Sequence, residues 1–261
     1  MRRGIATVAV LFVIAVLSVT ACSGAPPAPA ASAAAGTPAV PKAPRTTAAW
    51  KFTVSGTRQV SVNGSQDTVA QAAGATCNPA QLTADKRLGN EIASGFAVGA
   101  FPTAAALLRH FLAGAGTAVN YPAGSRIAQL ALASSAFQVV NRRVQAAVAH
   151  QLKAGGTRVK LSTGQLPTVE FSATTSDLYW SFRGTQGLTV TGTGSRTSGR
   201  YTGTLTYVIR DSYGFPVDDK LRGFGPPMRY LQTVCGAPQH PGGAHWFPDS
   251  VTVTVPVDQP D

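Results

Sequence analysis

The chain has 261 residues and a formal net charge of +11, yet charged residues make up only 13% of it, about half the share usual in globular proteins. Its 27 glycines and 18 prolines indicate a turn-rich fold with strands rather than a bundle of long solvated helices. Basic residues form no run longer than two and no nucleic-acid-binding module is recognisable, so the composition argues against a nucleic-acid partner. A positive net charge also suits a protein that lies near anionic lipid or an anionic wall polymer.

The first 21 residues have the layout of a secretory signal peptide. Arg2 and Arg3 supply positive charge, residues 4–21 are mostly apolar, and small residues precede the expected cleavage point. The alternative is a permanent transmembrane helix, which normally needs about 20 apolar residues. This run is slightly short and no positive residues follow it directly. We therefore expect residues 1–21 to be removed on export.

The end of this segment, residues 17–22 (Leu-Ser-Val-Thr-Ala-Cys), resembles the lipobox of bacterial lipoprotein precursors. The resemblance rests on Val19, on Ala21 and on the position of Cys22 directly after the apolar run. It implies that Cys22 carries a diacylglycerol, becomes the first residue and anchors the chain on the extracytoplasmic face of the cell membrane. The residue usage, with arginine ahead of lysine and much alanine, is similar to that of actinobacterial lipoproteins.

The three cysteines are Cys22, Cys77 and Cys235. An odd number in an exported protein leaves one thiol unpaired. If Cys22 carries lipid, Cys77 and Cys235 can form a disulfide in a compartment where disulfides persist; the alternative is two buried free thiols. The bridge would stabilise the fold by at most roughly 5 kcal/mol. It would also tie the helical half of the chain to its C-terminal end, which favours one domain.

Residues 22–49 read as a lipidated cysteine followed by a proline- and alanine-rich tether. Frequent prolines prevent a helix, and nothing large enough to nucleate a core is present. Such a spacer could hold a domain on the order of 30–90 Å from the lipid. We expect residues 50–258 to form a single α+β domain.

The first foldable segment, residues 51–62, alternates enough to predict one or two strands joined near Gly56, at the edge of the sheet. Helical spacing of apolar residues follows. Thr83 is expected to cap a first helix and Thr103 a second, which ends at Gly114.

A third helix has the clearest pattern, with Ser125 as its cap and a pair of glycines, 155–156, at its end. Its apolar stripe consists of Ile127, Leu130, Phe137, Val140, Val144, Val148 and Leu152. After it the pattern changes to period two. The predicted strands are 158–162, 168–173, 177–183, 187–194, 200–210 and 250–257. Helices followed by such strands predict an α+β fold, with N-terminal helices packed on a mostly antiparallel β-meander.

The densest polar and aromatic region is the long connection within residues 210–249. Its candidate functional residues are Asp211, Tyr213, Asp219, Arg222, Arg229, His240 and His245. Loops of this length in a compact domain are usually functional or disordered, and the aromatic content favours function. His240 and His245 with nearby aspartates could hold a divalent metal. Because His240 begins a His-Pro-Gly-Gly turn, we expect no metal and no cofactor.

The strand end at residues 210–215 (Arg-Asp-Ser-Tyr-Gly-Phe) is similar to the Asp-x-Tyr-Asp segment of colicin M-like toxins. These are β-rich enzymes that cleave the undecaprenyl-linked wall precursor. Asp211 and Tyr213 match the first two positions, whereas Gly214 stands in place of the second aspartate and the following His-Arg pair is missing. This six-residue resemblance implies hydrolysis of a lipid-linked precursor.

Common catalytic motifs are otherwise absent from the sequence, which has no Gly-x-Ser-x-Gly elbow, no Walker loop, no His-Glu-x-x-His and no Cys-x-x-Cys. The sequence therefore favours a cell-envelope lipoprotein whose domain is a non-enzymatic binding or structural module. The alternative is an envelope-acting hydrolase on a wall polymer or lipid-linked precursor that uses the 211–249 loop. The expected partners are the membrane, through the lipid anchor, and an anionic wall polymer or another envelope protein.

Overall fold

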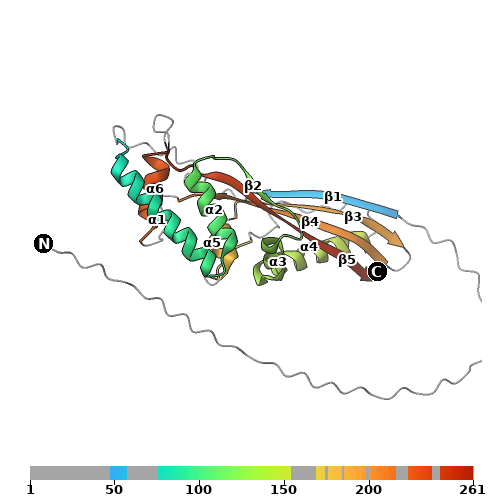
Figure 1. The fold of residues 1–261 in the computed structure, drawn as a ribbon. Helices are drawn as coiled ribbons and strands as arrows, with labels where there is room; N and C mark the ends of the chain where they lie inside the picture. The colour runs from blue at the N-terminus through green and yellow to red at the C-terminus, as the bar shows by residue number, and fades with distance from the viewer. Residues whose placement is uncertain are drawn as a thin grey trace, which may run out of the picture. The chain divides into compact units, whose positions relative to one another are not determined.

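Long antiparallel strands in the C-terminal half organise the fold of the computed structural model (Figure 1). The structure describes residues 48–57, 76–153, 169–173, 176–183, 185–197, 200–215, 223–236 and 242–260. All of them belong to one unit, residues 44–261. The predicted signal peptide, Cys22, most of the tether and the strand expected at 158–162 lie outside the described residues.

The described strands form a five-stranded sheet in the order β1-β3-β4-β5-β2. They are β1 (Ala48–Thr57), β2 (Val119–Tyr121), β3 (Gly187–Thr197), β4 (Arg200–Tyr213) and β5 (Phe247–Pro260). Three pairings are antiparallel, and β2 pairs with β5 in parallel. The predicted α+β fold with a mostly antiparallel sheet is confirmed, and β1 lies at the sheet edge as expected. The sequence pattern missed β2, because three residues are too few to show period two.

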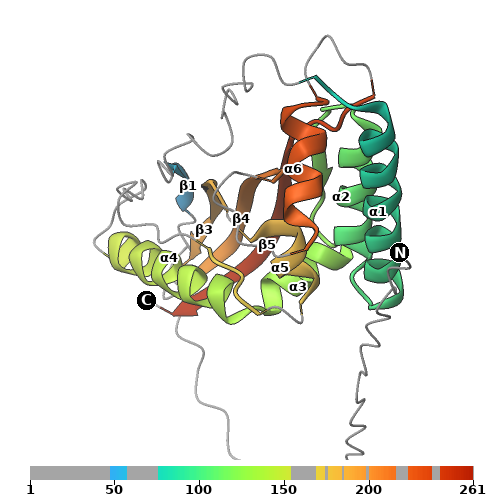
Figure 2. The same ribbon diagram turned by 90° about the vertical axis from the view of Figure 1, so that its left-hand side faces the viewer.

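Helices cover one face of the sheet and one end of its strands (Figures 1 and 2). They are α1 (Pro79–Val98), α2 (Pro102–Ala113), α3 (Arg126–Ala133), α4 (Ser135–Lys153), α5 (Asp177–Phe182) and α6 (Gly225–Thr233). One hydrophobic cluster joins α3, α4 and α5 to the inward side chains of β3, β4 and β5. A second cluster joins α1, α2 and α6 to Phe247 at the start of β5. The fold therefore has two adjoining cores along one pair of long strands.

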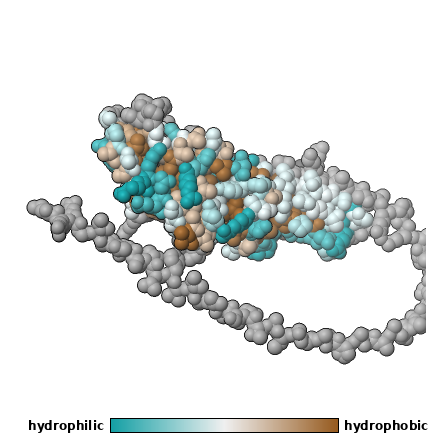
Figure 3. Space-filling model, in the orientation of Figure 1, coloured by the Kyte–Doolittle hydropathy of each residue, from teal (hydrophilic) through white to brown (hydrophobic). Residues whose placement is uncertain are grey.

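The opposite face of the sheet is solvated and rich in hydroxyl groups. Its partly or fully exposed threonines are Thr189, Thr191, Thr193, Thr202, Thr204, Thr206, Thr252 and Thr254. Threonine suits this position because its branched side chain favours strands while its hydroxyl stays hydrated. Figure 3 shows a pale surface over the strands, whereas the surface over α1 contains strongly hydrophilic patches. An exposed sheet face built mostly from threonines accounts for part of the low charge content.

The N-termini of the first two helices differ from the prediction. Thr83 does not cap α1; its hydroxyl donates to the carbonyl of Pro79 (2.9 Å), one turn earlier. The cap is Asn78, whose side chain accepts hydrogen bonds from the N–H groups of Ala80 (2.9 Å) and Gln81 (3.2 Å). Proline at the first helical position is pre-organised for a helix start, so the helix begins four residues earlier than Thr83.

Helix α2 is capped by a residue far away in the chain. Thr103 was expected to be its cap but lies inside its first turn, where it is buried. The Asp177 carboxylate accepts hydrogen bonds from the backbone N–H groups of Thr103 (3.1 Å) and Ala104 (2.9 Å). At its other end α2 stops as predicted at Gly114, which adopts a left-handed conformation with φ of 71°.

The third predicted helix is two helices. Ser125 caps α3 as expected, since its hydroxyl accepts from the N–H of Ala128 (3.4 Å). The chain then breaks at Ser134, which has an extended backbone and whose hydroxyl accepts from the N–H of Phe137 (3.2 Å). Ser134 therefore ends one helix and caps the next, while the apolar stripe continues through Ile127 and Phe137 into the same core.

Three further predictions are corrected. The strand expected at 177–183 is wrong: this segment is helix α5, because the Ser176 side chain accepts from the N–H of Leu178 (3.2 Å) and caps a helical turn. The described part of the strand expected at 168–173 forms no strand. The connection of residues 211–249, expected to be a loop, contains helix α6. The glycine and two prolines at the start of α6 are typical of turns, so the sequence pattern did not indicate a helix.

The Asp177 cap predicts a measurable loss of stability. In Asp177→Ala two buried N–H groups lose their acceptor, so the free energy of unfolding should fall by about 3 kcal/mol. Urea unfolding followed by tryptophan fluorescence measures this loss. Glu91→Ala, at an exposed position on α1, should change it by less than about 0.5 kcal/mol. Equal stability of the two variants would contradict the capping role.

Candidate functional site

Two aspartates lie directly opposite each other in the core-facing row of the sheet. Asp211 on β4 is paired in register with Asp249 on β5, and they are only 9% and 2% exposed. Directly opposed residues of antiparallel strands have Cβ atoms about 4.5–5.5 Å apart. The flanking pairs of the same row are Ile209 with Val251 and Tyr213 with Phe247. The carboxyl pair thus interrupts a row that is otherwise apolar and aromatic at this end of the ladder.

Asp249 is the less well solvated member of the pair. Neither of its carboxyl oxygens has a hydrogen-bond partner in the structure, whereas Asp211 accepts a hydrogen bond from the backbone N–H of Ser212 (2.8 Å). Burial raises the pKa of Asp249 well above its usual range, and the nearby charge of Asp211 raises it further. Both causes favour the neutral acid form of Asp249. A pair of this kind takes up and releases protons as a unit.

Tyr121 of β2 lies at the junction between the two cores, close enough to Asp249 to be affected by its charge. It packs against both hydrophobic clusters, and its ring meets that of Phe182 edge-on at 6.0 Å. Burial raises the pKa of Tyr121 to about 12, and the negative charges of Asp249 and Asp177 add to this. Its hydroxyl therefore remains a donor at neutral pH. Together with a neutral Asp249, the junction holds two proton-bearing groups in a poorly hydrated setting.

The aromatic candidate Tyr213 is part of a packed ring cluster. It stacks on Phe247 with ring centroids 5.5 Å apart and meets Phe215 and Phe111 edge-on at 6.1 and 6.3 Å. Such ring pairs add about 0.5–1.5 kcal/mol beyond the area they bury. Packing of the helical core against the strand end therefore accounts for this tyrosine.

The other predicted site residues are spread over the 211–249 region. Arg229 is half-buried on α6, and His245 is half-buried in the segment before β5, beside the glycine that ends α2. Asp219, Arg222 and His240 lie outside the described residues. Within the described ranges, no three side chains of histidine, cysteine, aspartate or glutamate are grouped so that they could hold a metal ion.

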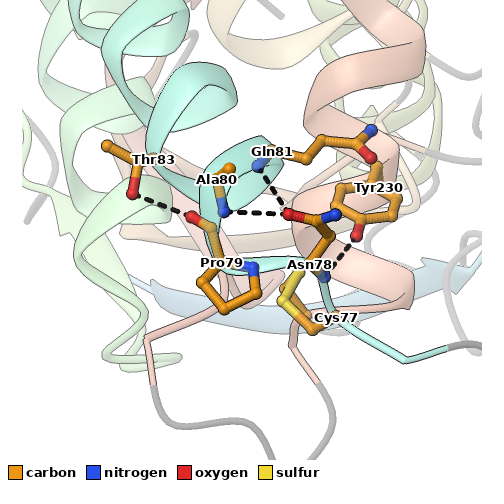
Figure 4. The surroundings of a disulfide bond; sticks show 8 residues. Cys77, Asn78, Pro79, Ala80, Gln81, Thr83 and Tyr230 are labelled. Carbon is orange, nitrogen blue, oxygen red and sulfur yellow. Dashed lines mark hydrogen bonds between the residues drawn. A yellow bond between two sulfur atoms is a disulfide. The ribbon is translucent and has the colours of Figure 1, made fainter.

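The predicted disulfide between Cys77 and Cys235 is present and adjoins the start of α1 (Figure 4). Next to it, the backbone N–H of Asn78 donates to the Tyr230 hydroxyl of α6 (2.8 Å). Gly243 passes so close to this bridge that a Cβ on it would lie 1.8 Å from the carbonyl oxygen of Cys235. The bridge thus joins α1 to the end of α6, where the returning chain leaves no room for a side chain.

Comparison with models of protein families, with curated proteins and with solved structures finds no match for this chain. Among the helices that the structure describes, none combines the length and apolar character needed to span a membrane.

Asp249 predicts an unusual dependence of stability on pH. The pKa of Asp249 is higher in the folded than in the unfolded protein. The stabilisation of the folded state by protonated Asp249 is therefore fully present below the unfolded-state pKa, and it is lost as pH rises through the folded-state pKa. Asp249→Asn keeps the shape without the charge, so it should be more stable than the wild type at the alkaline end of a series from about pH 5 to 9. Urea unfolding at each pH measures the difference.

Asp258 supplies the control for this series. It is exposed and paired with Arg200, whose hydrogen bond lowers the pKa of Asp258. The stabilising effect of this pair is therefore lost as pH falls, the opposite direction, and Asp258→Asn should not remove the alkaline sensitivity. Superimposable pH profiles of the wild type and Asp249→Asn would show that the buried acid does not govern stability.

Proposed function

We propose that this chain is a lipid-anchored cell-envelope protein whose folded unit is a non-enzymatic binding or structural module on the extracytoplasmic side of a bacterial membrane. The observation that carries the proposal is the use of the three cysteines. Cys77 and Cys235 are joined to each other, which leaves Cys22, at the lipobox-like position, as the remaining cysteine. A disulfide suits an exported protein, because cytosolic thiols are kept reduced.

The position of β1 is compatible with a tethered module. This strand, Ala48–Thr57, overlaps the end of the predicted tether and lies at the edge of the described sheet. Loss of Arg2 and Arg3 with the leader would lower the charge from +11 to +9, which still favours an anionic lipid surface or wall polymer.

The anchor is tested with Cys22→Ala in the native host. The wild-type protein should partition into the detergent phase and carry a diacylglycerol on its N-terminal peptide in mass spectrometry. The Cys22→Ala protein should lack the diacylglycerol mass. Molecules of this variant whose leader has been removed, as shown by N-terminal sequencing, should no longer be retained at the membrane. Cys77→Ala is the control, since it removes a disulfide cysteine and should leave lipidation intact. A diacylglycerol-modified Cys22→Ala protein would refute the assignment.

A hydrolase acting on a wall polymer or lipid-linked precursor is the second candidate, and the buried Asp211–Asp249 pair favours it. An acid with a raised pKa beside a second carboxylate is the arrangement that general acid–base catalysis uses. Asp211 is also the first position of the segment that is similar to colicin M-like toxins. If Asp211→Asn and Asp249→Asn both retain full biological activity while fold and lipidation persist, the hydrolase candidate fails.

A further inference from the structure

The turn between α1 and α2 forms an exposed apolar corner. Its eight residues, 95–102 (Gly-Phe-Ala-Val-Gly-Ala-Phe-Pro), have no polar side chain, and none of them is buried. Val98 is 90% exposed, compared with 41% for Val139 and Trp246, the other exposed large hydrophobic residues among those described. Figure 3 shows hydrophobic surface at this end of α1. Single hydrophobic residues are normal on a surface, whereas contiguous exposed apolar residues indicate a contact surface.

Backbone hydrogen bonds hold the corner in a defined turn. The N–H of Gly99 donates to the carbonyl of Gly95 (2.8 Å), and the N–H of Phe101 donates to the carbonyl of Phe96 (2.8 Å). Between them, Ala100 closes the turn with a left-handed φ of 67°. These bonds give two carbonyl groups at the end of α1 internal partners. Moving the turn into a poorly hydrated environment therefore costs less than it would for an open chain end.

Aromatic side chains support the corner from α5. The Phe96 ring meets the Phe101 ring edge-on at 6.2 Å and the Trp180 ring at 5.2 Å. Trp180 in turn meets Tyr179 edge-on at 5.0 Å, and all four residues are half-buried. Tryptophan and tyrosine are enriched at membrane–water interfaces, because each combines an apolar body with a polar tip. The residue types at this end of the molecule therefore fit the headgroup zone of a bilayer.

Positive charge adjoins the corner. The sequence from residue 92 to residue 169 contains seven arginines and lysines and neither aspartate nor glutamate. Within it, the exposed Arg126 at the start of α3 donates a hydrogen bond to the carbonyl of Ala100 (3.2 Å). This bond fixes a positive charge beside the apolar residues. An apolar projection next to a cation complements an anionic lipid surface.

The acidic residues nearest to the corner do not oppose this charge. Asp177 interacts with the start of α2, but it is only 3% exposed and its carboxylate accepts two backbone N–H groups there. Glu91, about two helical turns before Val98 on α1, forms an ion pair with Arg87 (3.9 Å). The surface of the corner therefore carries apolar and positive groups.

We propose that the corner of residues 95–102 inserts into the interface of an anionic bilayer, with Arg126 at the level of the lipid headgroups. The proposal rests on the lipid-anchored location given above and adds a direct contact between the folded unit and the membrane. The apolar side chains enter the boundary of the acyl chains, while the arginine meets the phosphates. This contact determines which side of the folded unit faces the membrane.

The lipid anchor makes a small contact of this kind effective. Cys22 precedes Ala48 by 26 residues, which span at most roughly 90 Å. Ala48 pairs with Arg196 at the end of the sheet away from Tyr213, about 40 Å along the strands. The chain is therefore long enough for the corner to reach the bilayer that holds the anchor. Tethering raises the local concentration of bilayer, so a weak contact becomes populated.

The test places a polarity-sensitive fluorophore on the corner of the mature, lipidated protein in vesicles of phosphatidylglycerol and phosphatidylcholine. Val98→Cys supplies the thiol for attachment. It is the reactive thiol of this variant, because Cys77 and Cys235 are joined and the third cysteine would carry the lipid. Thr204→Cys, exposed on the solvated face of the sheet, is the matched control. Lipids with brominated acyl chains quench a fluorophore where it contacts the bilayer interior.

The label at position 98 should emit at shorter wavelength than the label at position 204 and should be quenched by brominated lipid, whereas the control label should not be quenched. No quenching at position 98, or equal quenching at both positions, overturns the proposal. A shift to shorter wavelength without quenching by lipid also overturns it, because the corner then contacts another protein molecule. Mass spectrometry of Cys22 keeps the two proposals apart. A lipid-free Cys22 refutes the anchor, whereas lipidated protein without quenching refutes the corner.

Charge variants in the labelled Val98→Cys protein test the role of Arg126. One arginine near an anionic surface changes membrane partitioning about fivefold, so Arg126→Gln should lower the ratio of inserted to free corner by about this factor. In vesicles of phosphatidylcholine alone, Arg126→Gln should insert as well as its parent, whereas loss of a purely structural hydrogen bond would weaken insertion in both lipids. Arg210→Gln, on the solvated face of the sheet, should change neither. Equal insertion of Arg126→Gln and its parent in anionic vesicles refutes the headgroup contact.

Discussion

The pairing of β4 with β5 is the constraint on which the rest of the structure depends. Its 14 residue pairs run from Arg200 with Pro260 to Tyr213 with Phe247, and the inward row serves both hydrophobic cores. Along most of the ladder the row is covered by α3 and α4, and at the far end it meets α1, α2 and α6. Because side chains alternate strictly between the two faces, a slip of one residue would place the core residues in solvent and the threonines in the core.

Three aspartates at the junction of the cores show how differently the same group can be accommodated. Asp177 is buried but receives two backbone N–H groups from the start of α2, so its burial stabilises the helix it caps. Asp249 is equally buried without any hydrogen-bond partner in the structure, and its neutral form is favoured instead. Asp211 lies between these extremes, with one N–H bond from Ser212. A partnered carboxylate strengthens the fold, while an unpartnered buried one weakens the fold once it ionises.

The proposed function distributes its roles over separate parts of the chain. The lipid on Cys22 and the tether would set the location. The Cys77–Cys235 bridge joins the start of α1 to the end of α6, which suits a module on the extracytoplasmic side, where disulfides persist.

The sequence by itself determined the features that depend on neighbouring residues. These include the period-two strands β3, β4 and β5, the Ser125 cap, the stop of α2 at Gly114, and the pairing of the two remaining cysteines. Only the tertiary structure decided that residues 177–182 form a helix, since a hexapeptide with three aromatic residues suits either state until its neighbours are known. It likewise decided that Asp177 caps a helix 74 residues earlier and that Asp211 faces Asp249. The physical reason is that backbone preferences and local caps such as Ser125 act within a few residues, whereas long-range caps, strand register and core packing depend on partners from anywhere in the chain.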